Sequence, residues 1–187
     1  MNDQDLLRAY AESKDTEFLG AFFSRYQESL VRFVGKLLGD AETAQDVVQE
    51  TFLQVARHPS RLHGVESCHN WLLRVARNIG VTHVRRSVRA RRRAEHVAER
   101  TASDAAGAQA TRDAALETEE SRRRVRAEID RLNPRHREIL LLKIEENKSY
   151  KEIAEITGLT ATNVGYLLHT AMQALSARLK PLREELQ

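Results

Sequence analysis

The stretch from Ala94 to Glu120 sets the first limit on how this chain can fold. It holds seven acidic residues against two Arg, nine Ala and almost no large apolar side chain. Such a segment cannot bury enough apolar surface to offset the entropy it would lose on ordering. It therefore predicts a flexible acidic linker over residues 94–121, between two domains at 1–93 and 122–187.

The composition indicates that both domains are helical. Only eight Gly and three Pro are present in 187 residues, so few tight turns are available to join strands. Ala, Leu, Glu, Arg and Gln dominate, and these residues favour helices. The expected fold class is all-α, with two small helical domains.

The N-terminal domain shows a helical repeat of apolar residues over 18–39, ending at Gly39. Its predicted buried side consists of Phe22, Leu30, Phe33, Val34 and Leu37. Asp40 then predicts the cap of another helix. The buried side of that helix is expected to contain Ala44, Val48, Thr51, Phe52 and Val55.

The opposite side of this second helix carries an exposed Leu53 among polar residues, with Asp46, Gln49 and Glu50 beside it. An exposed Leu between carboxylates fits a protein-binding face. From spacing alone, a plain solvated face is an equal alternative.

A loop is expected over residues 58–70, and a strongly basic helix follows it. Trp71–Arg93 contains eight Arg and no acidic residue. Its predicted buried side is Leu72, Val75, Ala76 and Ile79, with Arg74 and Arg77 pointing away. This charge favours a nucleic-acid surface over a solvated basic face or a membrane-surface helix.

The C-terminal domain has clear helix boundaries. Asn133 and Pro134 predict a helix start, Ser149 and Glu152 a capping box, and Gly158 a helix end. Thr160 can cap the last helix, whose apolar stripe is Val164, Leu167, Leu168, Ala171 and Leu175. This arrangement fits a helix-turn-helix. Without the basic stretch upstream, a plain three-helix bundle would be an alternative of comparable weight, since the last helix has no Lys or Arg before Arg178.

Three stretches carry a resemblance to a known family: "AQDVVQETFLQV", "WLLRVARNIGVTHVRRSVRARR" and "LNPRHREILLLKIEENKSYKEIAEITGLTATNV". Together they resemble the extracytoplasmic-function (ECF) sigma factors of the sigma-70 family, over residues 20–93 and 122–178. The resemblance implies a region 2-like bundle and a region 4-like helix-turn-helix domain. It also implies a promoter-specificity factor that directs transcription initiation.

The resemblance assigns roles to individual residues. The RNA polymerase-binding residues would be Asp46, Gln49, Glu50 and Leu53. The loop 62–70 would take a flipped base, and the minus-ten DNA-binding residues would be His69, Asn70, Arg74, Arg77, Asn78, His83, Arg85 and Arg86. The minus-thirty-five DNA-binding residues would be Arg135, Arg137, Lys143, Thr160, Thr162, Asn163, Tyr166 and His169. The linker would lie in basic channels of the polymerase.

The sequence departs from the family pattern at several positions. Gln45 precedes a lone Asp46 where the family usually has two acidic residues, and Thr82 stands where Asp is common. In the last helix, basic residues are usual near four positions that here hold Gly165, Leu167, Thr170 and Met172. These departures put the strength of polymerase binding and of upstream recognition in question.

The sequence predicts no enzyme, no cofactor and no metal site, since it lacks a phosphate-binding Gly loop, HExxH and paired Cys ligands. With no signal peptide and no apolar run near the roughly 20 residues that span a bilayer, a cytoplasmic protein is expected. The expected partners are core RNA polymerase and promoter DNA, as duplex and melted strand; an anti-sigma factor stays open. The alternatives are a stand-alone helix-turn-helix regulator and an interaction-only sigma-like protein.

Overall fold

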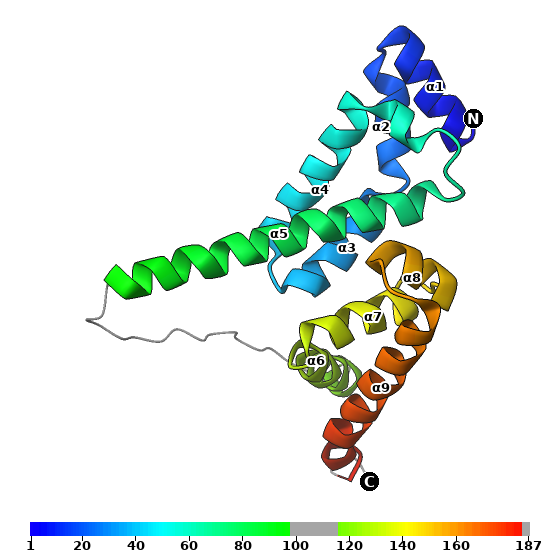
Figure 1. The fold of residues 1–187 in the computed structure, drawn as a ribbon. Helices are drawn as coiled ribbons and strands as arrows, with labels where there is room; N and C mark the ends of the chain where they lie inside the picture. The colour runs from blue at the N-terminus through cyan, green and yellow to red at the C-terminus, as the bar shows by residue number, and fades with distance from the viewer. Residues whose placement is uncertain (98–115, 185–187) are drawn as a thin grey trace.

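The structure is a computed structural model that describes residues 1–97 and 116–184. It is all-α in these ranges, as expected. The N-terminal unit contains α1 (Asp3–Ser13), α2 (Thr16–Ser24), α3 (Gln27–Leu38), α4 (Ala41–Arg57), a short 3-10 helix (Pro59–Leu62) and α5 (Cys68–Val97). The C-terminal unit contains α6 (Leu116–Asp130), α7 (Pro134–Ile144), α8 (Tyr150–Thr157) and α9 (Ala161–Glu184) (Figure 1).

The predicted helix ends are confirmed where a local cap defines them. The Asp40 carboxylate accepts the backbone N–H groups of Glu42 and Thr43 at the start of α4. Asn133 caps α7 ahead of Pro134, and a complete capping box opens α8. Gly39 and Gly158 end α3 and α8 in the left-handed region, with φ of +74° and +73°.

The repeat over residues 18–39 forms two helices, and the prediction of a single segment is wrong. The break falls at Arg25 and Tyr26, which bind the start of α1. The Arg25 guanidinium lies 2.6 Å from an Asp3 oxygen and donates to the Met1 carbonyl at 2.8 Å, while the Tyr26 hydroxyl donates to Asp3. These long-range bonds fix the two residues between the helices.

The predicted apolar stripes form the core of the N-terminal unit. All five residues assigned to the stripe over 18–39 are buried, as are the five assigned to α4. Phe23 of α2 stacks on Phe52 of α4 with ring centroids 4.0 Å apart. On α5 the fully buried residues are Leu72, Leu73 and Ala76, whereas Val75 is only half-buried. The prediction therefore missed Leu73.

The expected linker is helical at both ends. Helix α5 continues to Val97 and α6 begins at Leu116. The remainder of that stretch, residues 98–115, lies outside the described residues.

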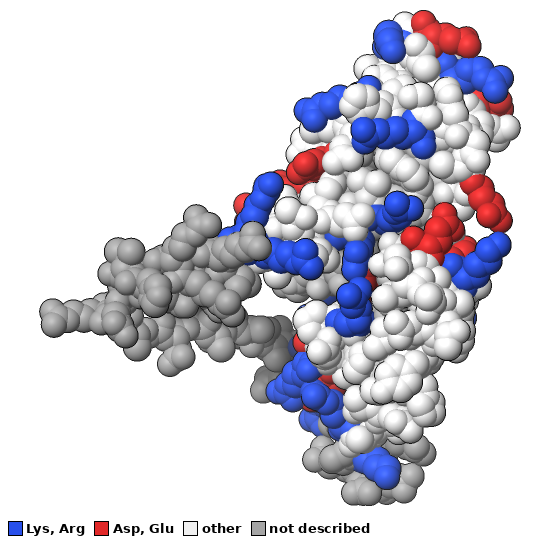
Figure 2. All heavy atoms as spheres, viewed as in Figure 1, with Lys and Arg blue, Asp and Glu red and all other residues white. Residues whose placement is uncertain are grey.

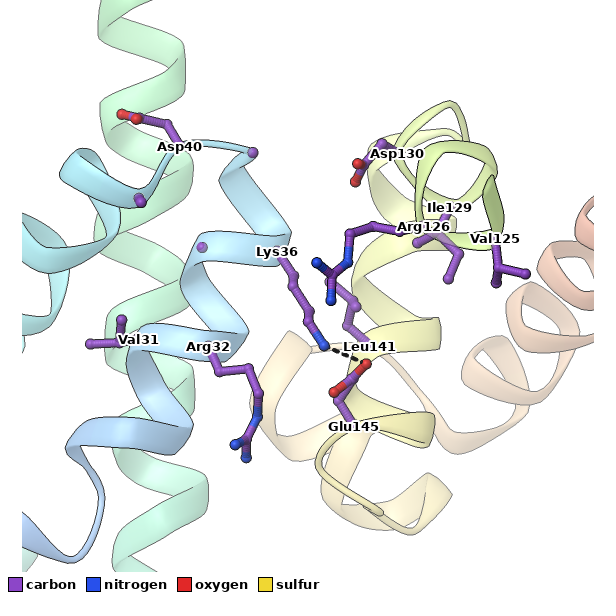
Figure 3. Close-up of a pocket in the computed structure, with 13 residues that line it drawn as sticks. Val31, Arg32, Lys36, Asp40, Val125, Arg126, Ile129, Asp130, Leu141 and Glu145 are labelled. Atoms are coloured by element: carbon purple, nitrogen blue, oxygen red, sulfur yellow. Dashed lines mark ion pairs between the residues drawn. The ribbon is translucent and has the colours of Figure 1, made fainter. Parts of the chain in front are cut away.

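The two units pack against each other through α3 and α5 on one side and α7 and α8 on the other (Figure 1). At one edge of this contact Lys36 of α3 pairs with Glu145, which follows α7, at 2.6 Å. The pair lies beside a groove of about 810 Å³, which Val31, Ile129 and Leu141 help to line (Figure 3).

Candidate polymerase and promoter interfaces

The four residues predicted to bind polymerase lie on one exposed face of α4. Asp46, Gln49, Glu50 and Leu53 follow a spacing of three and four residues, which places them on the same side of a helix. All four are exposed, and Leu53 retains 45% of its accessible surface. Val47 and Thr51 are fully buried on the opposite side, so the orientation of this face is fixed by packing.

The exposed part of α5 is basic. Of the eight residues predicted to bind the minus-ten element, four are exposed: Arg74, Asn78, Arg85 and Arg86. Figure 2 shows Lys and Arg side chains along this helix and near the junction of the two units. His83 is only partly exposed and lies 3.8 Å from Glu50, so the α4 face and the basic helix meet at this pair.

The other three predicted minus-ten residues face the C-terminal unit, contrary to expectation. His69 and Asn70 were placed in a loop, but α5 begins at Cys68 and includes both of them. Arg77 was expected to point away from the core, yet only 16% of its side chain is exposed. The sequence gives no sign of this, because the contacts join residues more than 60 positions apart.

His69 lies among residues of three segments. Its ring stacks on Tyr26, its Nε2 lies 3.0 Å from the Ser29 hydroxyl, and its Nδ1 lies 3.2 Å from the ammonium of Lys148. Burial first, and then the adjacent Lys148, lower the pKa of His69 from 6.5 to about 4. The ring is therefore neutral at pH 7, with Nδ1 accepting from Lys148.

Asn70 binds the first turn of the helix-turn-helix. Its side-chain amide donates to a carboxylate oxygen of Glu152 at 3.2 Å. Glu152 also completes the capping box of α8, and the hydrogen bonds from Ser149 lower its pKa to about 2. Asn70 is only 4% exposed, and its side-chain carbonyl oxygen is buried without a hydrogen-bond partner.

Arg77 and Glu138 form an ion pair across the two units. The Arg77 guanidinium binds both carboxylate oxygens, with Nη2 3.3 Å from Oε2. Glu138 is charged, yet it is only 4% exposed and directly precedes the apolar run Ile139–Leu142 of α7. A two-pronged contact of this kind satisfies both charged groups.

Helices α8 and α9 form the predicted helix-turn-helix, and the exposed side of α9 is that predicted to read DNA. Thr162, Asn163, Tyr166 and His169 are exposed, with Tyr166 at 68%. The Thr160 hydroxyl accepts the backbone N–H of Asn163 at 3.2 Å, so this residue also serves as the cap of α9.

The three basic residues predicted near phosphates differ in their surroundings. Arg135 is exposed at the start of α7. Arg137 is mostly buried and lies 3.5 Å from Asp130. The Lys143 ammonium donates to the Lys148 carbonyl at 3.2 Å and lies 5.8 Å from the centre of the Tyr150 ring.

Tyr150 is an exposed aromatic residue that is not among the predicted DNA-binding residues. It is 45% exposed at the start of α8, and its ring lies against Gly165 of α9. A Cβ at Gly165 would lie 3.4 Å from that ring, which is an ordinary van der Waals contact, so the Tyr150 ring packs beside this part of α9.

Within residues 1–97 and 116–184, no cluster of three His, Cys, Asp or Glu could hold a metal ion. The helices of the same ranges include none that is long and apolar enough to cross a membrane. Cys68 is buried, and burial, with Asp3 nearby, raises the pKa of its thiol to about 11. This thiol is poorly suited to act as a nucleophile.

Two family models match the chain in the order of its two units. The model for sigma-70 region 2 matches residues 22–92, and the model for sigma-70 region 4 matches residues 122–175. Together they cover most of the described helices.

Full-length relatives agree with these matches. The ECF RNA polymerase sigma factor SigL of Mycobacterium tuberculosis is 30% identical over 92% of this chain and 94% of its own length. The RNA polymerase sigma factor YlaC of Bacillus subtilis is 26% identical over 92% and 98%.

Two solved structures share the fold. The sigma factor RpoE of Bartonella quintana, solved with the anti-sigma factor NepR, gives a TM-score of 0.67 at 18% identity, over 89% of this chain and 98% of that one. CnrH, solved with the cytosolic domain of CnrY, gives 0.67 at 20%, over 96% and 97%. The chain belongs to the ECF group of the sigma-70 family, the promoter-specificity factors of bacterial RNA polymerase.

Proposed function

We propose that the three surfaces described above divide the work of promoter-specific initiation. The α4 face binds core polymerase, the basic helix α5 holds the melted minus-ten strand, and α9 reads the minus-thirty-five element. The observation that carries this proposal is the exposure of Asp46, Gln49, Glu50 and Leu53 on one face of α4. A stand-alone regulator has no need for such a face.

On α4, Leu53 supplies an apolar contact and the carboxylates surround it with charge. An exposed apolar residue inside a polar rim is typical of a protein-binding site. Gln45 is exposed beside Asp46, so the departure from two acidic residues leaves one fewer charge on this face.

On α5, the exposed Arg74, Arg85 and Arg86 bind backbone phosphates, while Asn78 contacts the edge of the melted duplex. The positive charge supplies affinity without regard to sequence. His69, Asn70 and Arg77 join them once the C-terminal unit no longer covers them. The flipped base then lies against the segment 62–70.

On the C-terminal unit, the exposed side of α9 enters the major groove with few cations. Thr162, Asn163 and Tyr166 present hydroxyl, amide and ring edges, which distinguish bases where a bare cation does not. Arg135 and Lys143 contact phosphates beside them. Tyr150 extends this surface through its contact with Gly165.

The factor acts as a binding and melting protein without enzymatic activity, in the cytoplasm, where the polymerase and the chromosome are. An anti-sigma factor is a further partner, because the solved relative RpoE was captured with the anti-sigma factor NepR. The proposed domain boundaries are 1–93 and 122–187.

The test is in vitro transcription with core polymerase and a library of promoters. Promoter-dependent transcripts that appear only with the added protein support the proposed function. Footprints on duplex DNA without polymerase and without new transcripts would indicate a stand-alone regulator. Polymerase binding without promoter opening would indicate an interaction-only protein.

A further inference from the structure

Helix α1 packs against the short 3-10 helix, in the segment that joins α4 to α5 (Figure 1). The model for sigma-70 region 2 matches residues 22–92, so α1 lies outside that match. The contacts of α1 nevertheless reach the segment 62–70, which is proposed above to take the flipped base. A helix outside the family match therefore touches a proposed DNA-binding element.

The side-chain amide of Gln4 contacts both ends of the loop 62–68. Its Nε2 donates to the Leu62 carbonyl oxygen at 2.8 Å and lies 3.9 Å from the Cys68 sulfur. Because a carbonyl oxygen only accepts hydrogen bonds, the amide nitrogen of Gln4 must be the atom that faces Leu62. One amide group thus joins the residue before the loop tip to the first residue of α5.

The ends of this loop are buried, whereas its tip is open to solvent. Leu62 is fully buried, and Cys68 is only 6% exposed. The exposed residues of the tip are His63, Gly64 and Glu66. The Val65 N–H also donates to the Leu62 carbonyl, but at 3.4 Å. The bond from Gln4 is shorter, so it is the stronger restraint on that carbonyl.

Helix α1 is itself held in place on both sides of Gln4. The preceding residue, Asp3, is bound to the break between α2 and α3. Farther along the helix, the Tyr10 hydroxyl donates to the Ala56 carbonyl at 3.3 Å. The Gln4 amide therefore restrains the loop against a helix that is already anchored.

We propose that Gln4 is a positioning residue for base recognition, whose amide braces the two ends of the loop 62–68 against α1. This inference rests on the proposed role of the segment 62–70 in taking the flipped base. A loop with fixed ends presents its tip in one conformation, so less conformational freedom is lost when a base binds. Without the brace, the loop still binds DNA but distinguishes the four bases less well.

Two substitutions remove the donor and keep the length of the side chain. Gln4→Met has neither donor nor charge, and Gln4→Glu replaces the amide nitrogen with an oxygen. Because these variants differ in charge, an effect common to both comes from the lost donor. Tyr10→Phe is the matched control, since it removes a bond from α1 to a backbone carbonyl outside the loop. Circular dichroism checks folding, and either Gln4 variant carries the test if the other does not fold.

Hydrogen exchange, followed by mass spectrometry, measures the brace in the free full-length protein. In both Gln4 variants we expect the amides of residues 62–68 to exchange about fivefold faster, as for the loss of one hydrogen bond. Tyr10→Phe should leave the exchange of this segment unchanged. Unchanged exchange in the Gln4 variants would overturn the proposal, because the amide would then not restrain the loop.

Base selectivity is measured on holoenzyme, assembled from core polymerase and the full-length protein. Fork-junction promoter DNAs carry each of the four bases at each minus-ten position of the melted strand in turn. His63→Ala with Glu66→Ala alters the exposed tip and so marks the position that the loop reads. At that position, both Gln4 variants should lower the ratio of affinities for the preferred and the other bases about fivefold. The ratios at the other positions, and all ratios for Tyr10→Phe, should stay as in wild type.

A purely structural role for Gln4 predicts a different result. Affinity would then fall equally for all four bases and the ratio would not change, which would overturn the proposal. A ratio altered only at positions that the tip variant does not mark would overturn it as well. The base-binding role of the loop is judged separately, by the tip variant. If that variant changes the ratio at no position, this part of the proposed function fails, and the positioning role fails with it.

Discussion

Helices α4 and α5 pack against each other in one unit, but their functional faces differ in accessibility. The four candidate polymerase residues of α4 are all exposed. On α5, His69 and Asn70 of the first turn contact the C-terminal unit, and Arg77 is bound to a buried Glu138. Under the proposed function, the free protein is arranged to meet polymerase first and melted DNA second.

This difference suggests a reason for the order of assembly. A basic helix that is always exposed would bind nucleic acid without regard to sequence. Under the proposed function, covering part of α5 limits such binding until polymerase engages α4 and the units separate.

The largest effect is expected on α4. Asp46→Lys with Glu50→Lys should weaken binding to core polymerase about 100-fold or more, because two attractive charges become repulsive. The C-terminal unit should stay folded, as judged by its melting curve. The same charge change at Glu12 and Glu17, exposed residues of α1 and α2, should leave polymerase binding unchanged. Retained binding by the α4 variant would show that the face is misassigned.

A smaller effect is expected on the uncovered face of α9. Tyr166→Ala should change the preference for upstream-element sequences by about fivefold, because the ring reads base edges. The dependence of DNA binding on salt should stay the same, since that slope counts phosphate contacts. Met172→Ala, at an exposed position outside the proposed reading set, is the matched control. A large drop in the salt slope for Tyr166→Ala would mean that the reading face lies elsewhere.

The smallest effect is expected from a change of pH, which protonates His69 at the covered start of α5. In the closed form, in which the two units are in contact, burial lowers the pKa of His69 to about 4. Lys148 and Arg32 lower this pKa further, whereas Glu152 raises it. Glu146 lies 3.4 Å from the Nε2 of His69, and Tyr26 stacks on the ring. In the open form, in which the units are apart, the pKa of His69 should return toward its ordinary value of 6.5. The contribution of neutral His69 to the closed form is therefore complete above pH 6.5 and falls as the pH drops toward 4.

Lowering the pH from 7.5 to 5.5 should shift the closed–open equilibrium about threefold toward the open form, a value reduced by the partial exposure of the ring. The radius of gyration measures this shift. His69→Gln removes the titrating group and should abolish it between these pH values. An unchanged pH response in that variant would assign the titration to another group.

Many helix ends of this fold could be predicted because they are set by residues close to them in the sequence. Asp40, Asn133, Ser149 and Gly158 each act within a few residues of themselves, so sequence alone locates their helix ends. The break at Arg25 and Tyr26 could not be predicted in the same way, since it depends on bonds to α1.

The candidate surfaces also differ in whether local sequence could predict them. The exposed face of α4 follows from helical spacing, and so does that of α9. The occupation of Arg77 by Glu138 does not, because 61 positions separate the two residues. The lack of cations on α9 before Arg178 also has a different meaning in three dimensions, because Tyr150 lies against Gly165 and Lys143 lies 5.8 Å from the centre of the Tyr150 ring.

The distance between the two units, with and without polymerase, tests the central claim most directly. A donor and an acceptor dye can be attached at Glu28→Cys and Lys151→Cys in a Cys68→Ser background, at exposed positions in α3 and α8 beside the contact between the units. Energy transfer should be high in the free protein and should fall when core polymerase is added. Equal transfer in the free and bound states would contradict the claim that polymerase binding separates the units and uncovers α5.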